Sequence, residues 1–232
     1  MRRVEDGTEI LDRPTPLADR AASLADIDRL NAWFGGHALT IRHVARLLRQ
    51  VPATEPVTVA DLGAGSGGLA VRLGRWGRHA RRRLSIIAVD LDHDTARLAR
   101  QRTASRDDIV VIRGDATALP LPDDSVDVVV SSLLLHHLEP GVASAVFTEM
   151  ARVSRLGFVV NDLWRARLGL LSVWLATRML GCHPISRHDG PLSVRRSYSP
   201  AEIHRLAARA RMRRLEVTRY PLLARVITVA EH

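Results

Sequence analysis

The stretch from 57 to 68 reads VTVADLGAGSGG and decides the fold class. It starts with a β-branched run that ends in Asp61, and glycines then recur at Gly63, Gly65 and Gly67. Glycine lets the backbone turn tightly and approach a ligand where a Cβ would clash. The stretch therefore predicts a strand that runs into a ligand-binding turn. A turn of this kind serves several ligands and by itself names none of them.

Outward from this turn, short β-branched runs alternate with segments of helical periodicity as far as Asp162. Such alternation is typical of a parallel sheet covered by helices on both faces, so we predict an α/β fold. Further strands are predicted at 84–90, 109–115, 126–132, 156–162, 213–220 and 224–230.

The N-terminal fifth of the chain is predicted to precede the sheet. Residues 1–20 are polar and contain prolines, and we expect them to form a flexible arm ahead of a single domain at 21–232. Within that domain, two helices at 21–50 are expected to form an N-terminal helical cap. Gly35 and Gly36 separate these helices because they interrupt the helical spacing of apolar residues.

A long apolar segment at 163–180 interrupts the alternation of strands and helices. We predict a helix there and a loop at 182–199, so that 163–198 form a lid-like insertion. Trp174 is expected to line an apolar pocket under this lid, and its replacement by Ala would then raise KM for the acceptor more than for the cofactor. Core or dimer packing is the ordinary role of such a helix, so the sequence leaves a homodimer open.

The composition is that of a globular protein with one core, because 46% of the 232 residues are hydrophobic and 25% are charged. No uncharged apolar run is long enough to span a bilayer. The N-terminus carries acids and prolines where a secretory signal would be apolar, so we expect a cytoplasmic protein. Cys182 is the only cysteine, which excludes intrachain disulfides and cysteine-rich metal sites, and no metal is predicted.

The net charge of +9 would ordinarily favour a nucleic acid or another anionic partner. The basic residues are all arginines, lie in several separate segments and have few aromatic neighbours. We therefore predict no nucleic-acid partner, and an RNA-binding role rests on the charge alone.

Two carboxylates narrow the choice of ligand at the glycine turn. Asp90 ends the second predicted strand, about 20 residues beyond the glycines, where a carboxylate accepts the two hydroxyls of a ribose. This fits both NAD and S-adenosylmethionine. Asp61 lies just ahead of the turn, where it would repel a pyrophosphate and attract an ammonium group. The sequence therefore favours the ligand with a cationic amino-acid tail.

The successive motifs VADLGAGSGG, AVDLD, GDATALPLPDDSVDVVVSSLLLHHL and LGFVVND resemble, in the same order, those of the class I S-adenosylmethionine-dependent methyltransferases. The resemblance covers about residues 55–162. It implies a Rossmann-like, doubly wound sheet of seven strands whose last strand is antiparallel, and S-adenosylmethionine as the cofactor. The cofactor contacts that it implies are Asp61, Leu62, Gly63, Ala64, Gly65, Gly67, Asp90, Leu91, Asp115, Ala116 and Ser131.

Within that family, the chain looks most similar to the small-molecule branch, which includes quinone and polyketide methyltransferases. Enzymes that methylate the exocyclic amines of nucleic-acid bases carry an NPPY-like or DPPY-like tetrad after the fourth strand, where this chain has SSLL at 131–134. The Pro-Cys nucleophile of cytosine C5 methylation is also missing. The resemblance therefore implies a small hydrophobic acceptor.

The candidate catalytic residues are histidines and a carboxylate, because a phenol or enol must lose its proton and histidine is best matched to neutral pH. His136 and His137 follow the fourth strand, whose carboxyl end faces the ligand crevice. We prefer His136 as the base, with His137 as its neighbour. Asp162, at the end of the fifth strand, and His188, beside Asp189 in the predicted loop, are further candidates.

The sequence thus predicts methyl transfer to the hydroxyl of a phenolic or polyketide-like compound, in bacterial secondary or quinone metabolism. Methylation of a carbon in an aromatic or quinone precursor is the nearest alternative, since no residue decides between oxygen and carbon. An RNA methyltransferase, a nicotinamide oxidoreductase and a noncatalytic S-adenosylmethionine-binding protein are the alternatives from other classes.

Overall fold

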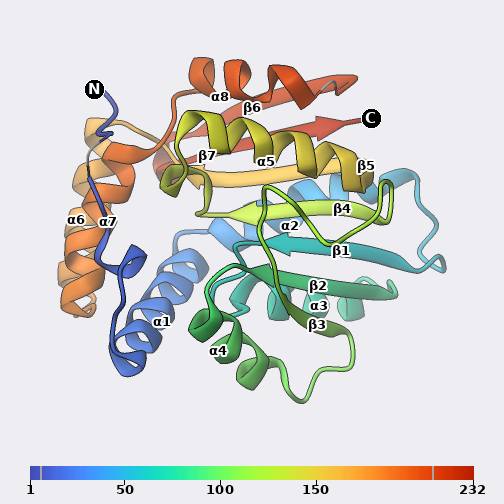
Figure 1. Cartoon of the computed structure of the whole chain (residues 1–232), viewed down its shortest axis with the longest axis horizontal. Helices are drawn as coiled ribbons and strands as arrows, with labels where there is room; N and C mark the ends of the chain where they lie inside the picture. The colour runs from blue at the N-terminus through green and yellow to red at the C-terminus, as the bar shows by residue number, and fades with distance from the viewer. Residues whose placement is uncertain (6, 211) are drawn as a thin grey trace.

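A mixed sheet of seven strands forms the centre of the molecule (Figure 1). The computed structural model describes residues 1–5, 7–210 and 212–232. The strand order is β3-β2-β1-β4-β5-β7-β6, so the order reverses between β1 and β4, where open α/β sheets have their ligand crevice. The strands are β1 (Val57–Leu62), β2 (Leu84–Asp90), β3 (Ile109–Arg113), β4 (Val126–Ser132), β5 (Ser154–Leu163), β6 (Arg214–Tyr220) and β7 (Arg225–Glu231).

The strand directions confirm the fold class. β1 to β5 pair in parallel with one another. β7 pairs antiparallel with both β5 and β6, so the last strand runs against the rest of the sheet and forms a hairpin with β6. The predicted sheet of seven strands with an antiparallel last strand is therefore correct.

Helices cover both faces of the sheet. Successive side chains of a strand point to opposite faces, and both sets are apolar in the central strands, so each face must be covered. Val129 of β4 packs into the core beneath α5 and α8, whereas Val128 and Val130 pack against α2 and α3 on the other face. Within the described residues, no helix is both long and apolar enough to cross a membrane. The helices are α1 (Leu17–Trp33), α2 (Gly36–Leu47), α3 (Gly68–His79), α4 (His93–Thr103), α5 (Pro140–Val153), α6 (Arg167–Met179), α7 (Pro184–Arg196) and α8 (Pro200–Ala207).

The insertion after β5 is a pair of packed helices, so the prediction of a loop at 182–199 was wrong. α7 occupies most of that segment. The side chain of His183 caps this helix by accepting from the Ile185 N–H, and Pro184 stands in the first turn, where its missing N–H costs nothing. Pro191 lies inside α7 and removes one helical hydrogen bond, but packing against α6 stabilises the helix despite that loss.

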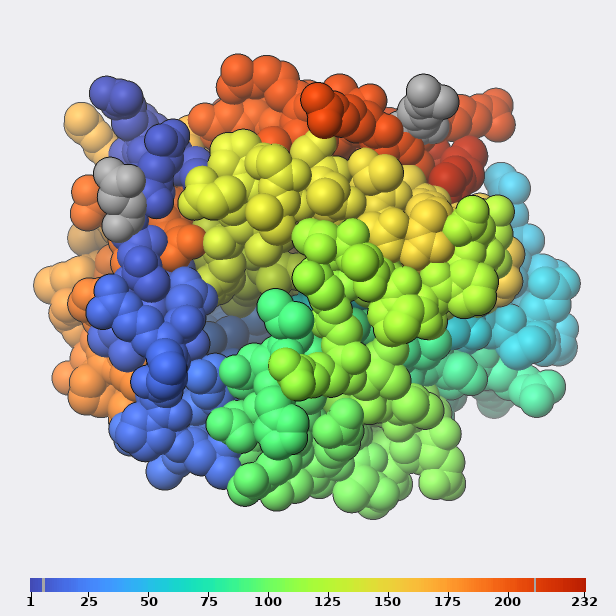
Figure 2. All heavy atoms as spheres, in the orientation of Figure 1, coloured from blue at the N-terminus to red at the C-terminus, as the bar shows by residue number. Residues whose placement is uncertain are grey.

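The N-terminal segment packs against α7, which differs from the flexible arm expected at 1–20. α1 already begins at Leu17, and Ile10–Asp12 forms a short 3-10 helix, η1. Two backbone N–H groups of η1 donate to the carboxylate of Asp189 on α7, at 2.9 and 3.1 Å. Figure 2 shows the segment, in blue, crossing this side of the molecule beside the orange helices. Its polar side chains make tertiary contacts, which composition alone does not reveal.

Candidate functional site

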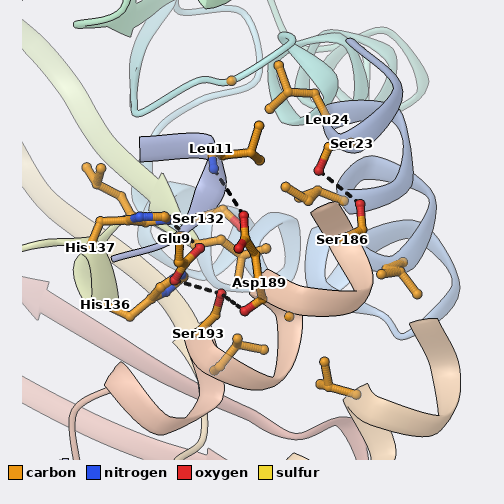
Figure 3. A pocket seen from close by; sticks show the side chains of 18 of the residues that line it. Glu9, Leu11, Ser23, Leu24, Ser132, His136, His137, Ser186, Asp189 and Ser193 are labelled. Carbon is orange, nitrogen blue, oxygen red and sulfur yellow. Dashed lines mark hydrogen bonds and ion pairs between the residues drawn. The ribbon is translucent and has the colours of Figure 1, made fainter. Parts of the chain in front are cut away.

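A cavity of about 360 Å³, here called the central cavity, lies at the carboxyl ends of β1, β2 and β4 (Figure 3). Gly63, Gly65 and Asp90 line one end of it. His136 and His137, on the short 3-10 helix η3 (Leu135–His137) that follows β4, line the other. Residues of η1, α1, α6 and α7 complete the wall. Its apolar side chains on these helices include Leu24 and Ile27 of α1 and Val173 of α6, whereas α7 contributes serines, an aspartate and a glycine. The cavity thus joins the glycine turn to the predicted catalytic histidines.

The glycine turn has the backbone conformation that its sequence predicts. Gly63, Gly65 and Gly67 have φ angles of 65°, 56° and 78°, a region that other residues rarely adopt. At Gly63, a Cβ would also lie 3.0 Å from the side chain of Leu134. The turn therefore presents backbone groups to the cavity at close range.

Asp61, near the end of β1, is a buried carboxylate without a partner. It is 1% exposed, and neither side-chain oxygen accepts a hydrogen bond. Burial raises its pKa to about 8, and the charges of Asp90 and Asp28 add to that rise. Asp61 lines a second, smaller cavity of about 50 Å³ together with Gly63 and Gly65. A carboxylate in this state fits a cationic group, so the residues present suit the ammonium of an amino-acid tail.

Asp90 ends β2 beside the glycine turn. Its Oδ2 accepts from the Gly65 N–H at 2.9 Å, and its Oδ1 accepts from the Asp92 N–H at 3.1 Å. Burial raises the pKa of Asp90, while these two hydrogen bonds act against the rise. The carboxylate is thereby held at the wall of the central cavity, which is the position predicted for the group that binds a ribose.

The remaining predicted cofactor residues divide into two groups. Leu62, Ala64 and Ser131 are buried at the ends of β1 and β4, and the hydroxyl of Ser131 has no hydrogen-bond partner. Ala64 lines the small cavity beside Asp61, whereas Leu62 and Ser131 line neither that cavity nor the central one.

The second group lies outside the central cavity, beyond β2 and β3. Leu91 is 60% exposed directly after Asp90. Asp115 follows β3, and its Oδ1 accepts from the N–H and the hydroxyl of Thr117 at 2.8 and 2.7 Å, which lowers its pKa. Ala116 lies beside it, half-buried against the core. These residues are therefore not part of the central cavity.

α1 closes over the glycine turn through Asp28, a residue that sequence analysis did not identify. Its Oδ2 accepts from the hydroxyl of Ser66 at 2.5 Å and also pairs with Arg102 of α4. Asn31 and His37 line the small cavity beside it, and burial lowers the pKa of His37 to about 4. An aspartate within an amphipathic helix carries no sequence signal of this role, because most such residues simply face solvent.

His136 is held by Asp162 and presents its other ring nitrogen to the cavity. Its Nδ1 lies 2.6 Å from Asp162 Oδ1, and its backbone N–H donates to Asp162 Oδ2 at 3.0 Å. Burial alone would raise the pKa of Asp162, but the charge and hydrogen bonds of His136 and the Leu163 N–H lower it. An ionised Asp162 selects the tautomer with hydrogen on Nδ1, which leaves Nε2 free to accept a proton.

His137 is held in the same way by Asp12 of η1, with Nδ1 2.9 Å from Asp12 Oδ1. Burial by itself would lower the pKa of His137, but the hydrogen bond to Asp12 and the charges of Glu9, Asp12 and Asp162 raise it to about 9. His137 is therefore an imidazolium at neutral pH. It already carries the proton that a base would have to accept, so the geometry does not support it as the base.

Glu9 lies beside the Nε2 atoms of both imidazole rings and was missed by sequence analysis. It is 3% exposed, with Oε1 3.8 Å from His136 Nε2 and Oε2 3.8 Å from His137 Nε2. The hydroxyl of Ser193 donates to Oε1 at 2.9 Å (Figure 3). The one sequence feature that could have identified Glu9 is its spacing from Asp12. The two residues are three positions apart, which places both carboxylates on one side of a helical turn.

Glu9, His136 and His137 also have the donor types that bind divalent metals. A metal on His137 would have to displace a proton whose pKa is about 9. The two rings also lie nearly face to face, with centroids 4.3 Å apart and planes inclined by 35°. We therefore interpret the cluster as hydrogen-bonded and charged, and not as a metal centre.

The structure does not bring His188 to the central cavity. In α7, His188 faces solvent, while the next residue, Asp189, is buried and lines the cavity. His188 Nδ1 lies 2.8 Å from Asp189 Oδ1, but that carboxylate also accepts from the backbone of η1. Asp189 thus anchors the N-terminal segment.

α6 lines the central cavity with a face other than the one predicted. Ser172, Val173, Ala176 and Thr177 lie on the cavity side. Trp174 is 43% exposed on the opposite side, where its ring stacks under the guanidinium of Arg178. The insertion therefore walls the cavity as a lid would, but the expectation that Trp174 lines it was wrong.

Comparison with known proteins agrees with this geometry. Residues 59–157, from β1 to the start of β5, match the family model described as a methyltransferase domain. An uncharacterized methyltransferase of Mycobacterium tuberculosis is 35% identical over 109 residues, which are 47% of this chain and 40% of that protein. A malonyl-[acyl-carrier protein] O-methyltransferase of Geobacter sulfurreducens is 31% identical over 166 residues, covering 70% of this chain and 58% of that protein. The chain thus spans less than two thirds of the length of either relative.

The fold is also found among solved structures. The crystal structure of a SAM dependent methyltransferase from Aquifex aeolicus has a TM-score of 0.57 and 19% sequence identity to this chain. The similarity covers 80% of this chain and 87% of that one. At this identity the comparison speaks for the fold, in which the carboxyl ends of β1, β2 and β4 form the crevice.

Proposed function

We propose that this chain, as a member of the class I S-adenosylmethionine-dependent methyltransferases, methylates the hydroxyl of a small hydrophobic acceptor of phenolic or polyketide-like type. One observation carries the proposal. The central cavity runs from Gly63 and Asp90 to His136 without interruption, and the wall between these ends is largely apolar. Its volume of about 360 Å³ is in the range of small-molecule sites.

Donor binding is assigned to the glycine end of the cavity. S-adenosylmethionine supplies a methyl group on a positively charged sulfur. Asp61 would pair with the ammonium of its amino-acid tail, and Asp90 would accept from the ribose hydroxyls. The backbone of the glycine turn would hold the tail, and Leu91, Asp115 and Ala116 would contact the adenine.

Acceptor activation is assigned to His136. The bound donor would supply its methyl group to the acceptor oxygen and leave as S-adenosylhomocysteine, and His136 Nε2 would take the hydroxyl proton. Asp162 stabilises the imidazolium that forms, because its carboxylate accepts from Nδ1 at 2.6 Å. Glu9 lies 3.8 Å from the same Nε2 and adds a second negative charge beside it.

The apolar side chains that α1 and α6 present to the cavity support a flat or long-chained acceptor with little polar surface. A relative named as an O-methyltransferase supports oxygen as the methylated atom. Methylation of an electron-rich ring carbon is the rival outcome, since the same base could remove a phenolic proton and activate the ring.

The test is a calorimetric titration with S-adenosylmethionine, S-adenosylhomocysteine and NAD, comparing the wild type with Asp90→Ala. We expect binding of both adenosyl sulfur ligands and none of NAD, with affinity reduced about tenfold or more in the variant, since hydrogen bonds to a charged group are lost. A screen of alkyl phenols then follows, with the position of the new methyl group determined by NMR.

Each outcome has a defined meaning. Methyl ethers among the products support the proposal, whereas ring-methylated phenols would assign carbon as the acceptor atom. Binding of the donor without turnover of any hydroxylated hydrophobic compound would contradict it and favour a noncatalytic role. Binding of NAD alone would overturn the assignment of the glycine turn itself.

A further inference from the structure

The solvent-facing side of α6 is apolar, which is the reverse of an ordinary surface helix. Its exposed positions recur at helical spacing and therefore form one stripe along the helix. The stripe consists of Arg167, Leu168, Leu171, Trp174, Leu175, Arg178 and Met179. Met179 is 80% exposed and Leu168 is 59% exposed, so these side chains are not covered by the rest of the molecule.

The charges in the stripe are of one sign only. Arg167 and Arg178 stand near its two ends, and the apolar residues lie between them. No acidic residue occurs from 163 to 180, and the chain as a whole carries a net charge of +9. The guanidinium of Arg178 lies 4.3 Å from the centre of the Trp174 ring. An apolar helix face flanked by arginines and a tryptophan matches the interfacial pattern of peripheral membrane proteins.

The stripe is close to the entrance of the central cavity. The opposite side of α6 lines that cavity, through residues such as Val173 and Ala176. Phe34 at the end of α1 and Leu222 of η5 (Pro221–Leu223) also line it, although they are 37% and 94% exposed. Figure 1 shows α6 and α7 at the left edge of the molecule, away from the sheet. Because η5 contacts α6, exposed apolar side chains lie both in the stripe and at the cavity wall next to the same helix.

We propose that the stripe on α6 docks this protein onto an anionic lipid bilayer. The apolar side chains enter the headgroup boundary, while Arg167 and Arg178 reach the lipid phosphates. The main alternative occupant is a second copy of this chain. Pairing two such stripes would bring four arginines together without a carboxylate in either stripe, which disfavours self-association and favours an anionic surface.

Docking in this orientation would place the cavity entrance near the apolar layer of the membrane. A long-chained acceptor dissolved in that layer could then enter without crossing water. This consequence for substrate supply rests on the proposed function. The docking itself does not rest on the proposed function, because it depends only on the exposed stripe.

The test measures binding of the full chain to vesicles of phosphatidylglycerol and phosphatidylcholine in equal parts, and to vesicles of phosphatidylcholine alone, by flotation. We expect stronger binding to the anionic vesicles. The double variant Leu171→Gln/Leu175→Gln should lower the partition coefficient about tenfold or more, because two leucine side chains no longer leave water. Arg167→Gln/Arg178→Gln should lower binding to the anionic vesicles ~20-fold and leave binding to phosphatidylcholine little changed.

The matched control is Val110→Gln, which changes a 58%-exposed residue on β3 at the edge of the sheet and should bind vesicles as the wild type does. Titration with S-adenosylmethionine confirms that each variant is folded. Because it measures donor binding independently of vesicle binding, a failure of the docking proposal can be told apart from a failure of the proposed function. Equal binding of wild type and the leucine variant to anionic vesicles would overturn the inference. A wild-type dimer that the leucine variant converts to monomers, seen by sedimentation velocity, would assign the stripe to a second copy instead.

Discussion

The two ends of the central cavity are built in different ways. The glycine end takes its residues from consecutive strand ends between β1 and β4, each next to a turn that the local sequence specifies. The histidine end combines η1, η3, the end of β5 and α7, which lie far apart in the chain. The local sequence therefore determines the structure of the glycine end, whereas the histidine end is assembled only by tertiary contacts.

The two ends also differ in how their carboxylates are satisfied. Asp61 has no hydrogen-bond partner among the described residues, and its pKa is raised to about 8. Asp162 and Asp12 each hold one histidine, at 2.6 and 2.9 Å. The glycine end is thus prepared for a cation that comes from outside, whereas the histidine end supplies its own positive charge. Changes at one end should therefore leave the other end intact.

The largest effect is expected from His136→Gln. This variant removes the base at the histidine end, so kcat should fall by about a thousandfold, while the affinity for S-adenosylmethionine stays unchanged. Steady-state kinetics and calorimetry on the same preparation measure both quantities. His188→Gln is the matched control, because His188 faces solvent and should leave both unchanged. Retention of most of the activity by His136→Gln would show that the hydroxyl loses its proton to another group.

A second prediction concerns the glycine end alone. Because the pKa of Asp61 is about 8 without a ligand, the carboxyl group is mostly protonated at neutral pH and must lose its proton to pair with an ammonium. Affinity for S-adenosylmethionine should therefore decrease as the pH falls below the pKa, by up to about tenfold for each pH unit.

Calorimetry at about pH 6 and about pH 7 measures this slope, and Asp61→Asn should abolish it, since the amide does not titrate. Proton release on binding, seen as a dependence of the measured heat on the buffer, is the accompanying signature. A wild-type affinity that is independent of pH would mean that Asp61 does not meet the ammonium.

The smallest effect is expected from Val173→Phe, on the cavity side of α6. The larger side chain fills part of the space at the acceptor end, so KM for the acceptor should rise about tenfold without a change in donor affinity. Leu175→Phe is the matched control on the outer face and should not affect KM for a water-soluble acceptor. An equal loss of donor affinity in Val173→Phe would mean that the two ends share this wall.

Sequence reasoning succeeded where local chemistry decides the structure. The positive φ angles of Gly63, Gly65 and Gly67 require glycine, so the turn could be predicted from residue types alone. Asp90 and His136 could be placed in one crevice because parallel strands end at the same edge of a sheet. The strand pattern likewise predicted a parallel sheet covered by helices, whereas the antiparallel last strand was implied only by the resemblance to the methyltransferase family.

Predictions from the sequence failed where tertiary contacts determine the conformation of a segment. Glu9 and Asp12 lie in a polar stretch whose composition is that of a loose arm, and only the fold brings them to the histidines. α7 contains Pro191 and has no clear apolar periodicity, so its helical state depends on packing against α6. Trp174 was misplaced because both faces of α6 are apolar, and periodicity cannot tell which of them is buried.

The attachment of the N-terminal segment to α7 has a consequence for how this chain can diverge in evolution. Asp189 fixes the backbone of η1, and Ser193 holds the side chain of Glu9, so two segments almost at opposite ends of the sequence form one functional wall. A new acceptor preference acquired through α7 would disturb the geometry of the arm unless both segments changed together. Positions 9 and 193 should therefore co-vary among homologues, and a chimera that exchanges the insertion should inherit the acceptor preference of its parent only when the first 16 residues are exchanged with it.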